Sequence, residues 1–166
     1  MIDSALDAVI AIDSGGRIIE WDPRAEVIFG WSAGEIIGQS LAGTIIPPEY
    51  RAAHMKGLDT FLSNGSGPIL NRRIEITALR RDGVEFPIEL AVNPLCFDEG
   101  YTFTAFIVDI SERKRAEAAL LDLSTFQKAM LDSAGHAIIS ATPDEIVRVF
   151  NPAAETLLGY TAEEMI

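Results

Sequence analysis

A repeat within the chain is the feature that most constrains its fold. Residues 1–37 align with residues 130–166 at a constant offset of 129 and without a gap, and thirteen of the aligned pairs are identical. Unrelated sequences of ordinary composition would share roughly two. The repeat therefore predicts two copies of one folding unit. The first copy continues for more than seventy residues beyond the repeat, so we expect residues 130–166 to be the start of a second module.

The pattern of the first copy predicts a β-hairpin followed by two short helices. A short apolar strand at 8–12 and a second strand at 17–21 are predicted on either side of the turn sequence Asp-Ser-Gly-Gly, which makes a hairpin. Asp22 precedes a proline, which is typical of an N-cap followed by the first helical position. Ser32 and Glu35 have the spacing of a capping box, which predicts the second short helix.

One longer helix and three strands are predicted downstream of this unit. The helix covers about 49–62, and the strands cover about 71–80, 85–95 and 101–108, with glycine-containing turns between them. Together with the hairpin this makes five strands. The predicted fold class is therefore α+β, a five-stranded antiparallel sheet with helices on one face.

The last predicted strand passes directly into a long helix. It ends at Asp109-Ile110-Ser111, where the acid or the hydroxyl residue is suited to cap a following helix. Residues 112–133 are rich in charged and helix-favouring residues. Their apolar positions fit a and d of a heptad, which predicts a parallel dimer contact. These positions are Ala116, Ala119, Leu123, Phe126 and Met130.

Charge and composition narrow the classes of function. The formal net charge of -12 argues against binding to nucleic acid or to an anionic membrane surface. No apolar run approaches the ~18–20 residues that span a bilayer, and Met1 leads into patterned sequence rather than a signal peptide. The single cysteine, Cys96, fits a reducing cytoplasm, and we interpret it as an apolar filler. Nucleophile, base and oxyanion donors do not occur together, so we expect no enzyme activity.

Three motifs resemble those of the PAS domain family and together cover nearly all of residues 1–116. They are Asp22-Pro23-x-Ala25-Glu26 leading to Gly30-Trp31, Arg80-Arg81-Asp82-Gly83 leading to Phe86-Pro87-Ile88-Glu89, and Asp109-Ile110-Ser111-Glu112-Arg113. The first motif recurs as Asn151-Pro152-Ala153-Ala154-Glu155 before Gly159-Tyr160. The resemblance implies a tandem arrangement: a PAS sensor domain at 1–111, a connecting signalling helix at 112–129 and a truncated second PAS domain at 130–166.

The resemblance also implies a role. PAS domains are sensory and dimerisation modules, usually cytoplasmic, that precede a histidine kinase, a diguanylate cyclase or a similar output domain. The expected partners are a second copy of this chain and a small-molecule ligand. In the family, the motif at Asp109-Ile110-Ser111 couples strand movement to the next helix, and here Arg81 or Arg113 is expected to pair with Asp109. A PAS interaction scaffold that binds no ligand is the alternative.

His54 is the candidate ligand-binding residue of the predicted helix 49–62. Its spacing to Leu58 and Phe61 places the imidazole on the apolar face, toward the sheet. A neutral imidazole in an apolar cleft is a suitable axial ligand for heme iron. Around this helix the sequence is similar to rhizobial heme oxygen-sensor kinases, which implies heme b with His54 as the iron ligand. Three apolar positions match heme-lining positions of that family: Ile69, Leu90 and Val92.

The similarity to heme sensors has two departures. The distal arginine of that family falls on Ile74, unless Arg72 or Arg73 substitutes through a shifted register, and a second histidine falls on Pro68. Histidine at the position of His54 also occurs in PAS domains that bind no heme, so a partly buried core histidine is the alternative interpretation. A photoactive flavin is disfavoured, because the predicted helix contains no cysteine.

Overall fold

The hairpin, the helices and the three later strands form one unit in the computed structural model, which describes residues 7–65, 67, 70, 72–97 and 100–166. This first unit extends to Lys114, and Arg115–Ile166 form a second unit. The elements of the first unit, in chain order, are β1 Ala8–Ile12, β2 Ile18–Trp21, α1 Pro23–Phe29, α2 Ala33–Ile36, α3 Leu41–Thr44, α4 Pro48–Asn64, β3 Arg73–Leu79, β4 Glu85–Phe97, β5 Gly100–Asp109 and the start of α5 Ser111–Ser133.

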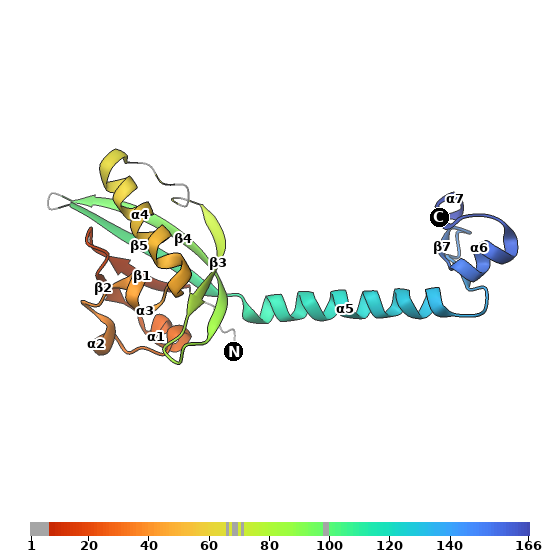
Figure 1. Cartoon of the computed structure of the whole chain (residues 1–166), viewed down its shortest axis with the longest axis horizontal. Helices are drawn as coiled ribbons and strands as arrows, with labels where there is room; N and C mark the ends of the chain where they lie inside the picture. Colours follow the sequence, from red (N-terminus) through yellow and green to blue (C-terminus); the bar gives the residue numbers. More distant parts are fainter. Residues whose placement is uncertain (1–6, 66, 68–69, 71, 98–99) are drawn as a thin grey trace. The chain divides into compact units, whose positions relative to one another are not determined.

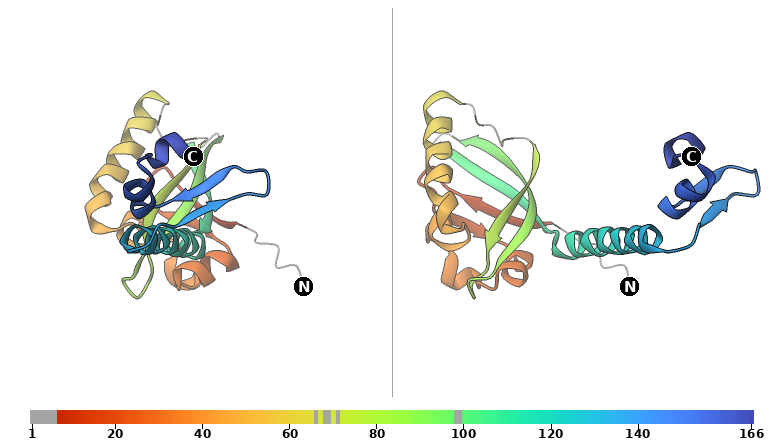
Figure 2. Two further views of the ribbon diagram at one scale, coloured as in Figure 1. Left: turned by 90° about the vertical axis from the view of Figure 1, so that its right-hand side faces the viewer. Right: turned by 45° about the vertical axis from the view of Figure 1, so that its right-hand side comes forward.

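The five strands of the first unit form one antiparallel sheet in the order β2-β1-β5-β4-β3. The chain leaves the sheet after β2, forms α1 to α4, and returns as β3 at the opposite edge (Figure 1). The second view of Figure 2 shows α4 on one side of the strands. The predicted α+β fold, a five-stranded antiparallel sheet with helices on one face and a long helix after it, is confirmed.

Local hydrogen bonds explain why the first unit turns where it does. Asp13 Oδ1 accepts from the amides of Gly15 and Arg17, at 2.9 and 2.8 Å, and closes the hairpin turn. Asp22 Oδ1 accepts from the amide of Ala25 at 2.7 Å, so it is the N-cap of α1 as predicted. Gly30 ends that helix at φ 79°, a left-handed conformation that favours glycine.

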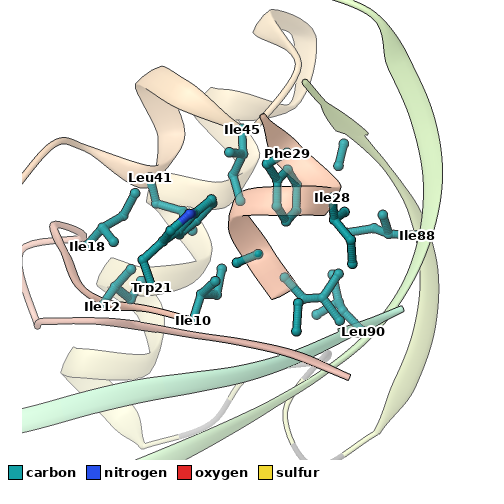
Figure 3. Close-up of a cluster of buried hydrophobic side chains, with 14 of the residues drawn as sticks. Ile10, Ile12, Ile18, Trp21, Ile28, Phe29, Leu41, Ile45, Ile88 and Leu90 are labelled. Carbon is teal, nitrogen blue, oxygen red and sulfur yellow. The ribbon is translucent and has the colours of Figure 1, made fainter. Parts of the chain in front are cut away.

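The core of the first unit lies between the sheet and helices α1 to α4. Phe29 is fully buried and contacts the rings of Trp21 and Phe86, with centroids 5.3 and 5.6 Å apart. Figure 3 shows Leu41 and Ile45 from the α3 segment pointing toward the same interior as the rings of Trp21 and Phe29. Burial of this apolar surface against the sheet is the main driving force for the fold.

The structure corrects two details of the sequence interpretation. Helix α3 was not predicted, because a single turn of four residues carries no hydrophobic period. Cys96 lies in β4, which extends further than predicted, and its side chain is exposed. The interpretation of Cys96 as a buried apolar filler was therefore wrong.

The second unit contains the rest of α5, a two-stranded antiparallel sheet and two short helices. Its elements after α5 are β6 Ile139–Ala141, β7 Val147–Phe150, α6 Pro152–Leu158 and α7 Ala162–Met165. Asn151 caps α6 and is buried. Within the described ranges, no helix of either unit combines the length and hydrophobicity needed to cross a bilayer.

Candidate functional site

A cavity of about 600 Å³ lies between α4 and the sheet of the first unit. Its wall is formed by residues of β1, the α3 segment, α4 and strands β3 to β5. The lining residues therefore come from early and late parts of the first unit's sequence. Ligand pockets in proteins typically measure ~300–1,000 Å³. The cavity is therefore large enough for a small molecule.

The wall of this cavity is almost entirely apolar. Among the described residues, four with polar side chains border it: Tyr50, His54, Glu75 and Thr77. Side chains alternate along a strand, and Ile74 and Ile76 of β3 line the cavity. Glu75 and Thr77 therefore border it through their backbone, which leaves Tyr50 and His54 as the polar side chains of the wall. None of the described residues in the wall is Lys or Arg.

His54 occupies the middle of α4 and forms part of the cavity wall, as the sequence predicted. Its Nδ1 atom is buried and has no hydrogen-bond partner among the described residues. Burial lowers the pKa of His54 from its ordinary value, because desolvation disfavours the charged imidazolium. The imidazole is therefore neutral at pH 7. Within the described part of the chain, no group of three or more His, Cys, Asp or Glu is placed to hold a metal ion.

Some of the other predicted cavity residues line the same wall as His54. Leu90 is buried and Val92 is half-buried, and both line the wall from β4. Ile74, at the position of the distal arginine in heme sensors, lines the wall from β3. Ile69 and Pro68 lie outside the described residues.

The second set of predicted residues stands at the start of α5. Asp109 Oδ1 accepts from the amide of Ser111 at 2.8 Å, and Asp109 Oδ2 pairs with Arg80 Nη2 at 2.5 Å. Ile110 is buried, and its carbonyl accepts the first helical hydrogen bond, from the amide of Lys114. Partial burial works to raise the pKa of Asp109, but the hydrogen bonds from Ser111 and the Arg80 guanidinium outweigh it and hold the pKa below its ordinary value.

Arg80, rather than either predicted arginine, is the ion-pair partner of Asp109. Arg80 also donates to the carbonyl of Ile28 at the end of α1 and stacks over the ring of Phe86, 3.8 Å from its centroid. The alternation of side chains along a strand could have predicted that Arg80 and Asp109 lie on the same face of the sheet. Arg80 lies two residues after Ala78, which lines the cavity, so both side chains are on the inner face, as is Asp109 two residues after Ile107.

The two arginines that were predicted for Asp109 have other partners. Arg81 makes a two-point ion pair with Glu35, at 2.9 and 2.6 Å. Arg113 pairs with Glu75 at 2.7 Å and with Glu89 at 3.5 Å. The pairs Arg81–Glu35 and Arg113–Glu75 join exposed groups, so each is expected to be weak individually.

Glu75 connects the strand beside the cavity to the first turn of α5. Its carboxylate accepts from Lys114 Nζ at 2.5 Å as well as from Arg113. The hydrogen bond from Lys114, together with Arg113, holds the pKa of Glu75 below its ordinary value. Sequence analysis missed this contact, because residues 38 and 39 positions apart carry no local pattern.

Comparison with protein-family models matches the PAS fold to residues 1–110 and 125–166. The chain belongs to the PAS fold family.

Solved structures of PAS domains share the fold of this chain. The PAS domain of a Colwellia psychrerythraea protein is 23% identical, with a TM-score of 0.55 over 66% of this chain and 91% of its own. The PAS domain of the RpfR quorum-sensing receptor of Cronobacter turicensis, solved in complex with C12:0, is 20% identical, with a TM-score of 0.52 over 66% of this chain and 99% of its own.

Relatives of this PAS chain include sensor proteins. It is 41% identical over 120 residues to an uncharacterised protein of Azorhizobium caulinodans, which covers 72% of this chain and 16% of the relative. It is 31% identical over 119 residues to the sensor protein FixL of Bradyrhizobium diazoefficiens, which covers 72% of this chain and 23% of FixL. The cell-division control histidine kinase PdhS of Brucella abortus is 30% identical over 120 residues, 72% of this chain and 11% of PdhS. The chain thus spans less than a quarter of the length of these relatives.

Proposed function

We propose that this chain is a ligand-responsive sensory and dimerisation module that acts on an output domain, a histidine kinase, through α5. The observation that carries the proposal is the position of β5. Phe103, Ala105 and Ile107 of this strand line the cavity, and the strand ends at Asp109, whose carboxylate holds the amide of Ser111. A molecule in the cavity therefore contacts the same strand that positions the start of α5.

The proposed mechanism is a shift between two populations of conformers. A ligand that packs between α4 and β5 favours one position of β5, and the contacts of Asp109 pass this bias to α5. Only a difference in ligand affinity between the two states can shift the equilibrium. Arg80 pairs with Asp109 and also donates to a carbonyl at the end of α1. A shift of Asp109 therefore also affects the contacts of α1.

A second connection runs from β3 to α5 in this proposal. Ile74 and Ile76 line the cavity, and Glu75 between them holds Arg113 and Lys114. Displacement of β3 by a ligand therefore alters the attachment of the first turn of α5. Because these ion pairs are exposed, salt is expected to weaken this connection more than the one at Asp109.

Dimerisation through α5 and the surface of the first unit is the further part of the proposal. The predicted heptad residues on α5 include Leu123, Phe126 and Met130, whose side chains are exposed in the single chain. A parallel pairing of two α5 helices would bury them.

The proposed domain division is a sensor domain at 1–111, a connecting helix at 112–129 and the beginning of a second PAS domain at 130–166. In this proposal the chain is part of a cytoplasmic protein and has no catalytic residues of its own.

The test replaces Asp109 with Ala in the whole chain and measures ligand binding and helix pairing separately. Binding is followed with the neutral apolar dye Nile red, and pairing with the distance between nitroxide labels at Gln127→Cys in a Cys96→Ser background. We expect the dye to change the label distance in the parent chain, and Asp109→Ala to abolish that change with dye affinity altered less than about threefold. If affinity falls as steeply as the distance response, the coupling role of Asp109 is wrong.

Heme binding is the second candidate, and the neutral imidazole of His54 in the cavity wall is the observation that favours it. His54 would hold the iron, and Leu90 and Val92 would contact the porphyrin. Two other requirements of a bound heme are not met by the described residues. The wall contains no cation for the propionates, and Nδ1, which must carry the proton when Nε2 binds iron, has no acceptor. The lining therefore fits heme poorly.

A visible absorption spectrum decides between the two candidates. The chain is purified from heme-replete cells beside its His54→Ala variant. A colourless parent chain that takes up no added hemin is the result we expect. A Soret band in the parent that disappears in His54→Ala would instead establish a heme sensor with His54 as the axial ligand.

A further inference from the structure

The charge of the cavity wall limits the class of ligand. Within the described residues the wall contains no Lys or Arg side chain, and the carboxylate of Glu75 is already paired with Arg113 and Lys114. An ionised carboxylate or ammonium group placed in such a cavity would lose its hydration without gaining a counter-ion, which is strongly unfavourable. The cavity therefore selects molecules that carry no charge.

The two nitrogens of His54 are not equivalent. Nδ1 is buried and has no hydrogen-bond acceptor among the described residues. If Nδ1 carried the proton of the neutral imidazole, a buried N–H donor would be left unpaired, and unpaired buried donors are costly and rare. We assign the proton to Nε2 on this ground. Since His54 lines the cavity, Nε2–H is then the hydrogen-bond donor that this side chain can offer to a molecule bound there.

We infer that the cavity takes an uncharged, largely apolar molecule with one hydrogen-bond acceptor, such as a ketone or ester carbonyl, that binds Nε2–H of His54. This inference rests on the proposed function, since it names the ligand class of the same cavity. The apolar body of the ligand would contact the side chains from α4 and from strands β3 to β5 that line the wall, among them Leu58, Ile74, Leu90 and Phe103. His54 then sets the orientation of the ligand, while burial of apolar surface supplies most of the affinity.

Displacement of Nile red from the whole chain at pH 7.5 tests the inference with four probes of similar length. Decan-2-one is the neutral acceptor, and 2-methyldec-1-ene is its isostere with the carbonyl oxygen replaced by CH₂. Decanoate and decylammonium are the charged probes. We expect decan-2-one to bind at least tenfold more tightly than either ion, because the wall offers the ions no partner.

Variants of the two polar wall residues separate the hydrogen bond from packing. His54→Phe should weaken decan-2-one about tenfold, the typical effect of one lost hydrogen bond, and should leave 2-methyldec-1-ene unchanged. His54→Gln, whose amide donates, should retain most of the preference for the ketone. Tyr50→Phe removes the other polar group of the wall, and a loss of the preference for the ketone in this variant rather than in His54→Phe would overturn the assignment to His54.

The protonated nitrogen of His54 is measured directly in the unmodified chain by long-range ¹H–¹⁵N correlation, with His54→Gln to assign the signal. We expect a neutral imidazole protonated at Nε2 and a change in its shift when decan-2-one is added. Protonation at Nδ1, decanoate binding as tight as the ketone, or equal losses for ketone and isostere in His54→Phe would each overturn the ligand class and leave the proposed function intact. Failure of every neutral probe to displace the dye from the folded chain would overturn both.

Discussion

Residues 8–37 and 137–166 adopt the same local structure in two different settings. In each, the two strands pair with the same register and the same irregularity, Ile12 with Ile18 in the first and Ala141 with Val147 in the second. Glu26 accepts from the amide of Ala33 at 2.6 Å, and its counterpart Glu155 makes the equivalent bond at 2.6 Å. Both segments also begin their second helix with a capping box.

The two segments differ in how much of their apolar surface is covered. Phe29 is fully buried, while its counterpart Leu158 is 47% exposed. Ile10 is 3% exposed, and its counterpart Ile139 is 47% exposed. In the first unit, strand β5 pairs with β1 beside Ile10, and Phe86 of β4 packs on Phe29.

The comparison shows that the local sequence determines the backbone structure of this motif, whereas β4 and β5 cover apolar side chains whose counterparts in the second unit are exposed. Two pairs of counterpart residues are buried in both segments. Trp21 and Phe150 are each 5% exposed, and Ala25 and Ala154 are fully buried. The cavity is lined by residues of the first unit, among them residues of strands β3 to β5.

The largest effect expected from this comparison is at the end of the first helix of each segment. Phe29→Ala should lower the free energy of unfolding of the first unit by ~3–5 kcal/mol, because it leaves a cavity in the core. Leu158→Ala should cost less than ~1 kcal/mol, because half of its side chain is already exposed. Urea unfolding measures the first, through the fluorescence of Trp21 and Trp31, and amide hydrogen exchange measures the second.

If Leu158→Ala lowered the free energy of unfolding as much as Phe29→Ala, the predicted difference between the two segments would be wrong. Such a result would mean that Leu158 is covered in solution by a second copy of the chain or by other residues. Val27→Ala is the control, because Val27 is in the same helix as Phe29 and is exposed. It should have little effect on either measurement.

The next prediction concerns the residue before the first helix of each segment, where the substitution in the second unit should be the more destabilising one. Asn151 is buried and makes four side-chain hydrogen bonds, accepting from the amides of Ile138 and Ala154 and donating to the carbonyls of Leu131 and His136. Asn151→Ala should destabilise the second unit by ~2–3 kcal/mol, since several buried groups lose their partner.

Asp22→Ala, the matched change in the first unit, should cost only about 1 kcal/mol, the usual effect of losing an N-cap. Hydrogen exchange of the α1 and α6 amides measures both. Asn151→Asp sharpens the test, because a carboxylate keeps the two acceptor contacts and loses the two donor contacts. If it matches the parent chain in stability, the donor contacts to Leu131 and His136 contribute nothing.

A third effect belongs to the first unit alone, since it depends on β5. Asp109→Asn should lower its free energy of unfolding by ~1–2 kcal/mol at pH 7, a range that allows for the partial exposure of this ion pair. The pKa of Asp109 is lowered by folding, so this stabilisation is fully present above the ordinary value of about 4 and is lost progressively as the pH falls from there through the lower pKa of the folded chain. Urea unfolding at pH 7 and pH 3.5 checks both points: the difference between the two chains should be smaller at pH 3.5, and an unchanged difference would contradict an electrostatic cause.

The smallest effect concerns His54 and the cavity. Because folding lowers the pKa of His54, the unfolded chain binds more protons below pH 6.5, and the first unit should lose stability as the pH falls from 7 to 5. His54→Gln should lose less over the same interval, as measured by urea unfolding at both pH values. His136, which is exposed in the second unit, supplies the control variant His136→Gln. Parallel pH dependence in all three chains would argue that His54 is solvated.

Much of the site was predictable from particular residues. The period of α4 placed His54 on the cavity wall, and the motif at Asp109 located the start of α5. The partner of Asp109 was not predicted, because adjacent arginines at 80 and 81 differ only in which face of the sheet they occupy. The contact of Glu75 with Lys114 joins residues 39 positions apart, and only strand order determines it.

The sequence by itself determined the short-range features of this protein: the hairpin, the caps of α1 and α6, the glycines that end those helices, and the PAS family membership they indicate. These depend on hydrogen bonds and dihedral preferences within a few residues. The tertiary structure decided which apolar residues are buried, and the volume and lining of the cavity around His54. These depend on how β3, β4 and β5 close over the helices, and long-range packing of that kind leaves no signature in any single stretch of sequence.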